Sequence, residues 1–469
     1  MVFTSTVFLF LFLPVVLAIY YYPPLRRHRT GQNYFLLFAS LVFYAWGEPV
    51  FVFLMIGSII LTWLIGLRIN SHEDRAGRKR VLTIGIICHV TLLFIFKYLT
   101  FFSQEFNRFS GFSTFQIDIS LPIGISFFTF QMMSYLFDVY YRKAKVQKNI
   151  LNLGLYVALF PQLIAGPIVR YETVEDEILH RVETKDDFIA GIRRFVIGLG
   201  KKALLADFLA VIADNIFSLV HVGSVTALTA WIGAVSYTLQ IYFDFSGYSD
   251  MAIGLGLCFG FHFRENFNHP YCAVSVRDFW RRWHISLTDW FRDYVYIPLG
   301  GNRAGKRRQI WNTVLVWILT GIWHGANWTF LLWGLIYCLL QLAETHLLCT
   351  DRWPRFLQHM YTLLLVCLCW VLFRAQSAGD AIRYFSALFG RCGFTDAVAM
   401  WYLRNSSVIL TISVLSCLPL PPTLHPSSAA SGISVAREVL IYIMLTAIVI
   451  LTVIFSISGS YSPFIYFNF

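Results

Sequence analysis

Long apolar runs separated by short polar loops make up most of this chain. A helix needs about 20 apolar residues to cross a bilayer, with a range of about 17–25, and several runs are shorter or contain Pro and Gly. We therefore expect an all-α polytopic membrane protein with about 11 transmembrane helices, plus re-entrant or interfacial helices. The apolar runs lie at residues 7–22, 34–46, 49–67, 81–97, 119–140, 150–169, 190–218, 225–243, 250–262, 310–324, 328–342, 360–373, 406–419 and 437–457.

The composition supports this class and one integral membrane domain over residues 1–469. The chain is 57% hydrophobic and only 13% charged, whereas soluble proteins carry about 25% charged residues. Its net charge of +11 does not indicate nucleic-acid binding, because Lys and Arg cluster in the loops between apolar runs. The first run has no preceding basic residue and no small-residue cleavage site, so we expect it to be retained as a span.

Basic loops predict the orientation in the membrane. Residues 26–29, 68–80 and 142–148 are rich in Lys and Arg, and the loops between them are short or poor in these residues. Residues 277–308 hold eight Lys or Arg against three Asp. Because cytoplasmic loops of membrane proteins are enriched in Lys and Arg, we expect these four regions in the cytoplasm and the N-terminus in the periplasm.

His324 is the strongest candidate for a catalytic residue. It lies about 14 residues into an apolar helix that begins near Ile310, which places it roughly 21 Å along the helix. Ionisable groups at such depth are costly and usually face a bundle interior or a cavity. Trp323 could wall a channel and Asn327 could orient the imidazole. The alternative is a neutral His that hydrogen-bonds a neighbouring helix.

His284 is the second candidate, in a stretch with helical periodicity over residues 277–296. Its aromatic positions include Trp280 and Trp283, and its cationic positions include Arg281 and Arg282. The guanidinium group matches phosphate geometry, so the Arg cluster and His284 could meet an anionic donor. A helix that only lies in the membrane interface explains the same pattern.

Three further polar clusters lie in apolar context, and Pro and Gly within them predict broken helices around a polar cavity. The first, at residues 122–131, ends in Gln131, and the second spans 160–170. The third, at 242–250, contains Asp244, Ser246 and Tyr248. Each cluster alone is equally consistent with a helix kink or a packing site. Their occurrence together with His324 favours a central cavity lined by Gln131, Asp244, Ser246 and Tyr248.

Several other chemistries are not supported. The chain contains no G-x-S-x-G elbow and no Walker A, G-x-G-x-x-G or H-E-x-x-H motif. The pattern His284-x4-Asp289 would place the two side chains about 140° apart on a helix. The nine Cys include no C-x-x-C pair, so we expect no metal site and no disulfide framework.

In these residues the chain resembles the membrane-bound O-acyltransferase family, specifically its bacterial branch that acetylates polysaccharides such as alginate and cellulose. The similarity begins at VFLFLFLP (7–14) and continues to SPFIYFNF (462–469). Six internal motifs carry it, in order LPIGIS (121–126), FPQLIAGP (160–167), YFDFSGYSD (242–250), WRRWHISL (280–287), RDYVYIPLGGN (292–302) and WHGANW (323–328).

The resemblance implies a ring of helices around a central tunnel, with His324 as the intramembrane catalytic His and His284 as the second. It also implies acetyl-CoA as a cytoplasmic donor, no permanently bound cofactor and a periplasmic polysaccharide acceptor. A separately encoded periplasmic acetyltransferase is the implied partner. The implied location of this chain is the inner membrane of a bacterium.

Alternative functions remain open at this stage. Peptidoglycan O-acetylation and D-alanylation of teichoic acid use the same kind of chemistry. A transporter or flippase would use a carboxylate at membrane depth, and Asp244 could serve as one. A scaffold for a biosynthetic complex would not need His324.

The orientation is testable with single cysteines introduced at residues 26–29, 68–80, 142–148 and 303–308. We expect a membrane-impermeant thiol reagent added outside intact cells to label none of them, and to label all after the membrane is opened. Efficient labelling of residues 303–308 in intact cells would contradict the cytoplasmic location of the donor side.

Overall fold

The computed structural model describes residues 1–469 except 112–116, 224, 420–434, 458–463 and 465–469. The described residues form helices and no strand, in two compact units. The polar linker expected at 420–433 lies outside the described residues, as does the closing motif apart from Phe464. The first unit comprises residues 1–195 and 249–264, and the second comprises 196–248 and 265–469. The expectation of a single domain stays a prediction.

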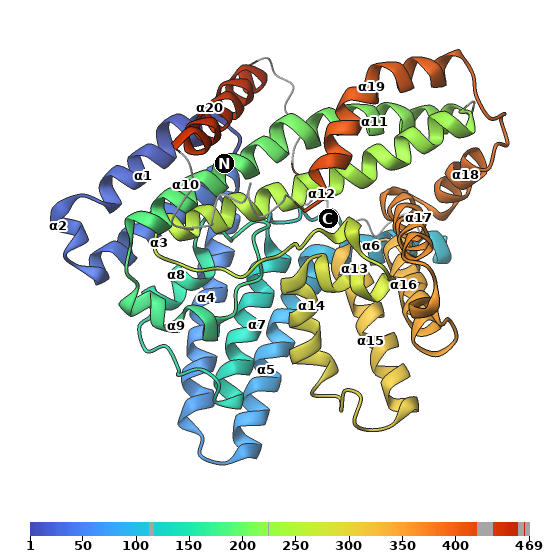
Figure 1. The fold of residues 1–469 in the computed structure, drawn as a ribbon. Helices are drawn as coiled ribbons and strands as arrows, with labels where there is room; N and C mark the ends of the chain where they lie inside the picture. The colour runs from blue at the N-terminus through green and yellow to red at the C-terminus, as the bar shows by residue number, and fades with distance from the viewer. Residues whose placement is uncertain (112–116, 224, 420–434, 458–463, 465–469) are drawn as a thin grey trace. The chain divides into compact units, whose positions relative to one another are not determined.

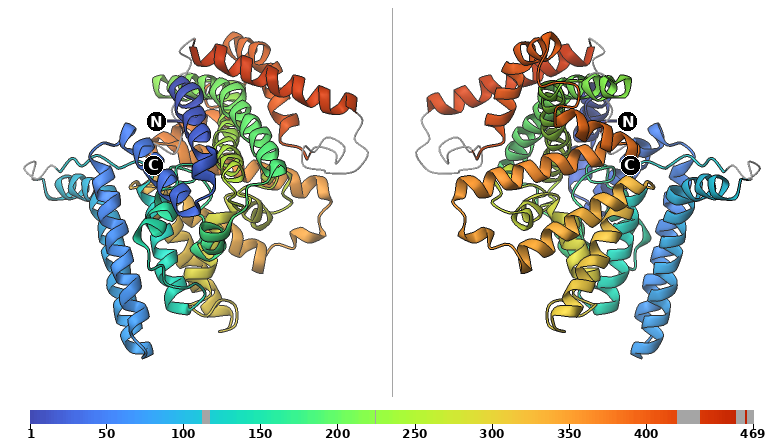
Figure 2. Two further views of the ribbon diagram at one scale, coloured as in Figure 1. Left: turned by 90° about the vertical axis from the view of Figure 1, so that its left-hand side faces the viewer. Right: turned by 90° about the vertical axis from the view of Figure 1, so that its right-hand side faces the viewer.

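The first unit is built around long helices that pack side by side. Its longest pair, α4 and α5, packs against α7, and α3 packs against α8 (Figures 1 and 2). Its helices are η1 Phe8–Phe12, α1 Leu13–Tyr20, α2 Pro23–Arg26, α3 Arg29–Gly47, α4 Phe51–Ser71, α5 Arg75–Leu93, η2 Phe94–Tyr98, α6 Leu99–Ser110, α7 Ile125–Tyr141, α8 Ile150–Ala158, α9 Tyr171–His180 and most of α10 Lys185–Gly200.

The second unit holds both candidate histidines. Within it α15 packs closely on α16, and α16 packs on α17. Its helices are η3 Lys201–Ala206, α11 Asp207–Val222, most of α12 Ala227–Cys258, η4 Pro270–Cys272, α13 Val276–Arg282, α14 Ile285–Phe291, η5 Arg292–Tyr296, α15 Lys306–His324, α16 Trp328–His346, η6 Thr350–Arg352, α17 Arg355–Arg374, α18 Ala378–Leu388, α19 Ala397–Ser416 and α20 Val435–Ile457.

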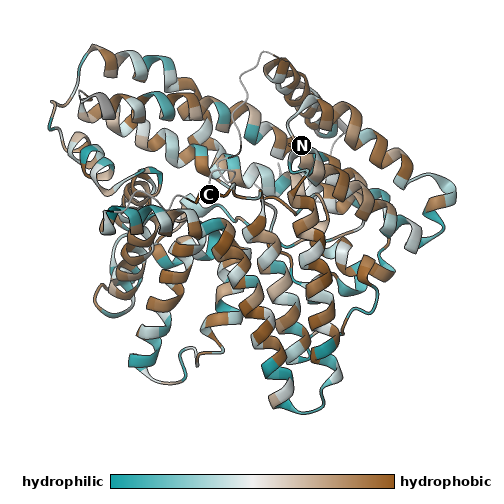
Figure 3. Ribbon diagram, turned by 180° about the vertical axis from the view of Figure 1, so that it is seen from behind, coloured by the Kyte–Doolittle hydropathy of each residue, from teal (hydrophilic) through white to brown (hydrophobic). Residues whose placement is uncertain are grey.

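Apolar side chains cover the outside of these helices. Phe53, Ile87, Leu440 and Ile443 are each more than half exposed, which is costly in water and favourable in lipid. Hydrophobic residues run along most helices in Figure 3, and hydrophilic residues gather at helix ends and in loops. The chain is therefore a multi-pass membrane protein.

Seven helices in the described part of the chain are long and apolar enough to cross a membrane. The expected count of about 11 stays a prediction, because several apolar runs form shorter helices such as Phe8–Tyr20. The seven are Phe51–Ser71, Arg75–Ser110, Lys185–Val220, Trp328–His346, Arg355–Arg374, Ala397–Ser416 and Glu438–Ile457.

The predicted helix breaks occur at two of the three polar clusters. Residues 119–124 precede α7, and residues 159–170 follow the end of α8 without helical structure. The third prediction is wrong, because 242–250 lies within the unbroken 32-residue helix α12. Gly247 does not break this helix but brings it close to its neighbour. A Cβ at Gly247 would lie 2.8 Å from the carbonyl oxygen of Gly198.

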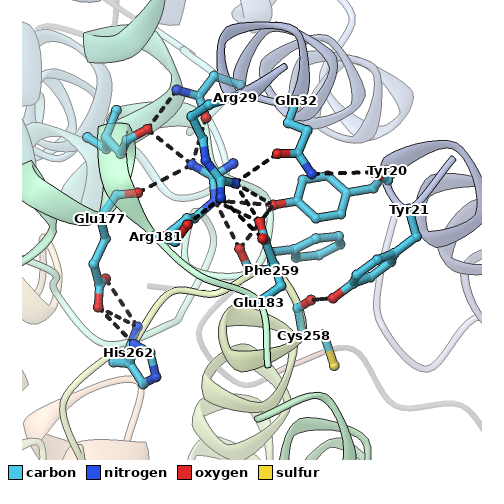
Figure 4. Close-up of polar contacts among 12 residues, drawn as sticks. Tyr20, Tyr21, Arg29, Gln32, Glu177, Arg181, Glu183, Cys258, Phe259 and His262 are labelled. Carbon is cyan, nitrogen blue, oxygen red and sulfur yellow. Dashed lines mark hydrogen bonds and ion pairs between the residues drawn. The ribbon is translucent and has the colours of Figure 1, made fainter. Parts of the chain in front are cut away.

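A buried ionic cluster ties the 181–183 segment to the first helices of unit one (Figure 4). Glu183 accepts hydrogen bonds from Tyr20 and Arg29, each at 2.5 Å. The Arg181 side chain is fully buried, and its Nε donates to the carbonyl oxygen of Phe259 at 3.0 Å. Burial opposes the ionisation of Glu183, but the hydrogen bonds from Arg29 and Tyr20 outweigh it and lower its pKa.

We expect Glu183→Gln to destabilise the protein by about 3 kcal/mol, because it leaves buried Arg181 without its carboxylate. The lowered pKa gives Glu183 a stabilising effect that is present above its unfolded pKa of about 4.3 and is lost as the pH falls. Melting temperatures measured between pH 7 and pH 4 should fall more for wild type than for Glu183→Gln. Asp176→Asn, which changes an exposed carboxylate nearby, is the control. If Glu183→Gln were as stable as Asp176→Asn, Glu183 would not have this stabilising role.

Candidate functional site

The segment that carries His284 is two short helices with a sharp break between them. The prediction of continuous helical structure over 277–296 is wrong, because α13 ends at Arg282 and α14 begins at Ile285. His284 adopts a left-handed conformation with φ of 45°, which few residues other than Gly adopt without compensation. The break turns the His284 side chain into the protein, where it is fully buried.

Buried polar groups compensate for this break. The Glu344 carboxylate on α16 accepts hydrogen bonds from the backbone nitrogens of Val276 at 2.7 Å and Arg277 at 3.1 Å. A carboxylate at a helix N-terminus also interacts favourably with the helix dipole. At the same helix end the Ser275 hydroxyl accepts from the Asp278 nitrogen at 3.0 Å. These contacts fix the start of α13 and therefore the position of the turn at His284.

Asn266 holds the His284 ring. Its Oδ1 lies 3.2 Å from His284 Nδ1 and accepts from the Ser286 backbone nitrogen at 3.2 Å and the Ser286 hydroxyl at 2.9 Å. Since an amide oxygen can only accept, Nδ1 carries the proton and Nε2 is the basic nitrogen. Burial lowers the pKa of His284 to about 3, so this imidazole is neutral near pH 7.

His324 is the last residue of α15 and is 3% exposed. Its ring is bordered by Trp333 at 5.0 Å and Phe373 at 5.2 Å, both nearly perpendicular to it. The helices α15 and α16 approach closely here, since a Cβ at Gly321 would lie 2.6 Å from the carbonyl oxygen of Phe330. The small residue therefore accommodates a neighbouring helix.

Trp323 connects the two candidate histidines. Its ring centre lies 5.0 Å from that of His324 and 5.9 Å from that of His284. On its other side His284 meets the edge of Phe245 at 4.7 Å, which belongs to the polar cluster of α12. Residues from α12, α15 and the turn between α13 and α14 thus converge within one unit, around two imidazoles and their aromatic neighbours.

Trp280 and Trp283 lie in a buried aromatic cluster and not at a lipid interface. Trp280 contacts Trp317, Trp333 and Tyr337 at 5.0–5.6 Å. Trp283 contacts Trp370 at 4.9 Å. Such packing excludes water and stabilises each pair by about 0.5–1.5 kcal/mol beyond burial. Both Trp residues therefore build the wall behind His284.

The Arg residues beside His284 differ in their contacts. Arg281 is exposed. Arg282 forms an ion pair with Asp278 at 3.0 Å one helical turn away. Arg292, the first residue of η5, pairs with Asp289 at 2.6 Å, so Asp289 of the His284-x4-Asp289 pattern has a cationic partner three residues later in the chain.

Asn327 and Trp328 form the turn after His324. Asn327 caps α16, where its Oδ1 accepts from the Thr329 nitrogen at 3.1 Å, and its Nδ2 donates to the Gln376 carbonyl oxygen at 2.8 Å. Trp328 is 54% exposed. Of the two Trp residues that flank His324, only Trp323 is therefore enclosed beside the imidazole.

The remaining candidates take different places. Asp244 is buried and pairs with Lys202 at 2.7 Å. Ser246 and Tyr248 are buried on the same helix, and the Tyr248 ring contacts Phe464 at 4.8 Å. Gln131 is buried in the first unit, where its backbone carbonyl oxygen accepts a hydrogen bond from the Tyr156 hydroxyl at 3.2 Å.

Sequence reasoning missed Asn266 and Glu344. Glu344 could have been noticed, because a carboxylate that follows an apolar run requires a partner. Asn266 gives no such signal, since an Asn in a polar loop is common and only the fold places it against His284. In the part of the chain that the structure describes, no group of three or more His, Cys, Asp or Glu could hold a metal ion.

Comparisons with known proteins identify the family of this chain. The family model described as MBOAT, membrane-bound O-acyltransferase family, matches residues 89–367, which include both candidate histidines. A protein of Azotobacter vinelandii named "Probable alginate O-acetylase AlgI" is 40% identical over 507 residues, covering 100% of both chains. Its namesake in Pseudomonas aeruginosa is 45% identical over 397 residues, which covers 83% of this chain and 75% of the relative.

The name of a more distant relative refers to a different acceptor of the acetyl group. The peptidoglycan O-acetyltransferase of Helicobacter pylori is 32% identical over 529 residues, covering 100% of this chain and 98% of the relative. The similarity therefore extends across acceptors, while the acyltransferase chemistry is shared.

We expect Asn266→Ala to destabilise the protein by about 1–3 kcal/mol, because it removes the acceptor for buried donors of His284 and Ser286. Asn266→Asp retains an acceptor oxygen and should raise the pKa of His284 by placing a carboxylate beside it. Thermal melting and NMR titration of the imidazole would measure the two effects. Asn268→Ala, at an exposed position of the same loop, should change neither. An unaltered His284 titration in Asn266→Asp would contradict the assigned contact.

Proposed function

The chain belongs to the membrane-bound O-acyltransferase family, and we propose that it moves an acetyl group from cytoplasmic acetyl-CoA to the periplasmic side for O-acetylation of an exopolysaccharide. The observation that carries this proposal is the enclosed pair His324 and His284 around Trp323. An acyltransferase needs a group that can take a proton from the attacking hydroxyl, and His is well suited to this near pH 7.

His324 is assigned the reacting position. Its surroundings of Trp333, Phe373 and Trp323 exclude water, which protects an acyl group from hydrolysis. As a general base, His324 takes a proton from the hydroxyl that attacks the thioester carbonyl, and the thiolate of CoA leaves. As an acyl carrier, its nitrogen attacks first and passes the acetyl group on. Both roles require the neutral ring.

The donor side is assigned to the Arg cluster before His284. Arg281 and Arg282 lie at the end of α13 in the segment expected in the cytoplasm, and guanidinium groups bind phosphates through paired hydrogen bonds. The aromatic wall of Trp280 and Trp283 leads inward from them. Through a tunnel past His284 the acetyl group reaches His324.

The acceptor is proposed from the names of the relatives. Those at 40% and 45% identity carry alginate in their names, which favours an alginate-type exopolysaccharide over peptidoglycan or teichoic acid. A separately encoded periplasmic transferase is the proposed partner for the last step. The protein is proposed to lie in the bacterial inner membrane, and the alternation of basic loops supports an orientation with its N-terminus outside.

We expect His324→Ala and His324→Gln to reduce acetyl transfer from labelled acetyl-CoA by about 100-fold or more, which is the usual contribution of a general base. Gln retains hydrogen bonding but cannot carry a proton near pH 7. Membrane insertion and melting temperature should remain near those of wild type. His346→Gln, at the end of α16, should retain activity. Substantial acetyl transfer by a folded His324 variant would show that His324 serves only in packing.

A further inference from the structure

The turn between η5 and α15 concentrates positive charge that the protein itself does not balance (Figure 1). Its four exposed cationic residues are Arg303, Lys306, Arg307 and Arg308. Within the part of the chain that the structure describes, no carboxylate forms an ion pair with any of them. By contrast, Arg282 and Arg292 of the preceding helices are paired with Asp278 and Asp289. The turn is therefore suited to an anion from outside the chain.

The turn is held in one conformation by its own hydrogen bonds. The buried Asn312 side chain donates to the carbonyl oxygens of Gly301 at 3.2 Å and Leu299 at 3.4 Å. Arg308 Nε donates to the same Leu299 oxygen at 3.0 Å, which uses one of the five N–H donors of its guanidinium group. Gly300 and Gly301 adopt φ of 106° and 52°, which glycine tolerates without strain. Because the backbone is already fixed, an anion that binds here has to order less of the chain.

The exposed face of α15 continues from these charges into an apolar stripe. Trp311 is 71% exposed, and Leu315 and Ile322 are each 39% exposed. They follow Arg308 at helical spacing, so that charge, indole and aliphatic groups lie in this order along one face. Trp is enriched at the level of the lipid headgroups. Trp311 therefore indicates that the boundary of the apolar layer lies within about one helical turn of the charges.

We propose that this turn binds the phosphate of an anionic phospholipid headgroup, with the acyl chains along Trp311 and Leu315. Clusters of four or more Lys and Arg beside a membrane helix attract anionic lipids, and guanidinium groups bind phosphate through paired hydrogen bonds. A soluble acidic protein would use the charges but leave the exposed apolar face of α15 without a partner. A phospholipid satisfies both, because its charged and apolar parts follow in the same order as those of the helix.

This lipid is neither the donor nor the acceptor of the acetyl group. It binds at the first turn of α15, and His324 is the last residue of that helix. The donor phosphates are assigned to Arg281 and Arg282 at the end of α13, a different segment of the chain. Lipid binding can therefore be measured without acetyl transfer, and competition with acetyl-CoA distinguishes the two kinds of phosphate.

The test compares two lipids that differ in headgroup charge. The full chain in detergent is titrated with phosphatidylglycerol and with phosphatidylcholine, and bound lipid is measured by native mass spectrometry. We expect wild type to bind phosphatidylglycerol at least about tenfold more tightly, because each Lys or Arg near an anionic headgroup contributes roughly fivefold. Lys306→Gln/Arg307→Gln removes two charges and keeps the hydrogen bonds of Arg308 and Asn312. It should weaken phosphatidylglycerol binding at least about tenfold and leave phosphatidylcholine binding unchanged.

Two further variants separate the site from net charge and from general lipid contact. Arg391→Gln/Arg404→Gln removes two exposed Arg residues on separate elements and should bind both lipids as wild type. Trp311→Gln should weaken both lipids equally, because the indole contacts lipid whatever the headgroup charge.

Four outcomes would overturn the proposal. The first is unchanged phosphatidylglycerol binding by Lys306→Gln/Arg307→Gln, and the second is an equal loss in Arg391→Gln/Arg404→Gln, which would leave only an effect of net charge. The third is displacement of phosphatidylglycerol by acetyl-CoA, which would assign the turn to the donor. The fourth is tighter binding of polyglutamate than of phosphatidylglycerol, which would assign the turn to an acidic protein.

Discussion

The structure depends on one constraint: every backbone polar group inside the membrane must find a partner within the protein. Helices meet this demand locally, which explains why the regular secondary structure of the described residues is helical. A break in a helix exposes nitrogens and carbonyl oxygens that lipid cannot satisfy. The same demand holds in the buried interior of the protein, and near the turn at His284 buried side chains replace the missing partners. Asn266 accepts from the Ser286 nitrogen after the turn, and Glu344 accepts from the nitrogens at the start of α13.

The same constraint explains the chemistry of the site. Aromatic side chains from α15, α16 and α17 surround the two imidazoles. A neutral imidazole in such surroundings is costly to protonate, and the lowered pKa of His284 reflects this cost. The same aromatic packing keeps both imidazoles buried.

Two clusters of buried charges follow a parallel rule, because opposite charges lie next to one another in each. Lys202 lies 2.7 Å from both Asp207 and Asp244, and Arg181 and Arg29 surround Glu183. Such pairs offset the cost of removing charges from water only when the geometry is fixed by further contacts. Asp244 is therefore held within an ion pair, which gives no support to the alternative of a transporter with an unpaired carboxylate at membrane depth.

The sequence by itself determined the class of the protein and its two candidate histidines. Long apolar runs in a weakly charged chain predict membrane helices, and a His within such a run usually faces protein or a cavity, which makes His324 a candidate. His284 is a candidate through its motif in a basic aromatic stretch. Tertiary structure decided what surrounds them. The periodicity of residues 277–296 indicated one amphipathic helix, but Asn266 and Glu344, distant in sequence, stabilise a turn at His284 that periodicity cannot reveal. Gly247 looked like a helix break, whereas it permits close helix packing. A glycine in a sequence leaves both outcomes open, because only the neighbouring helix determines whether the missing Cβ makes room for packing or relieves strain.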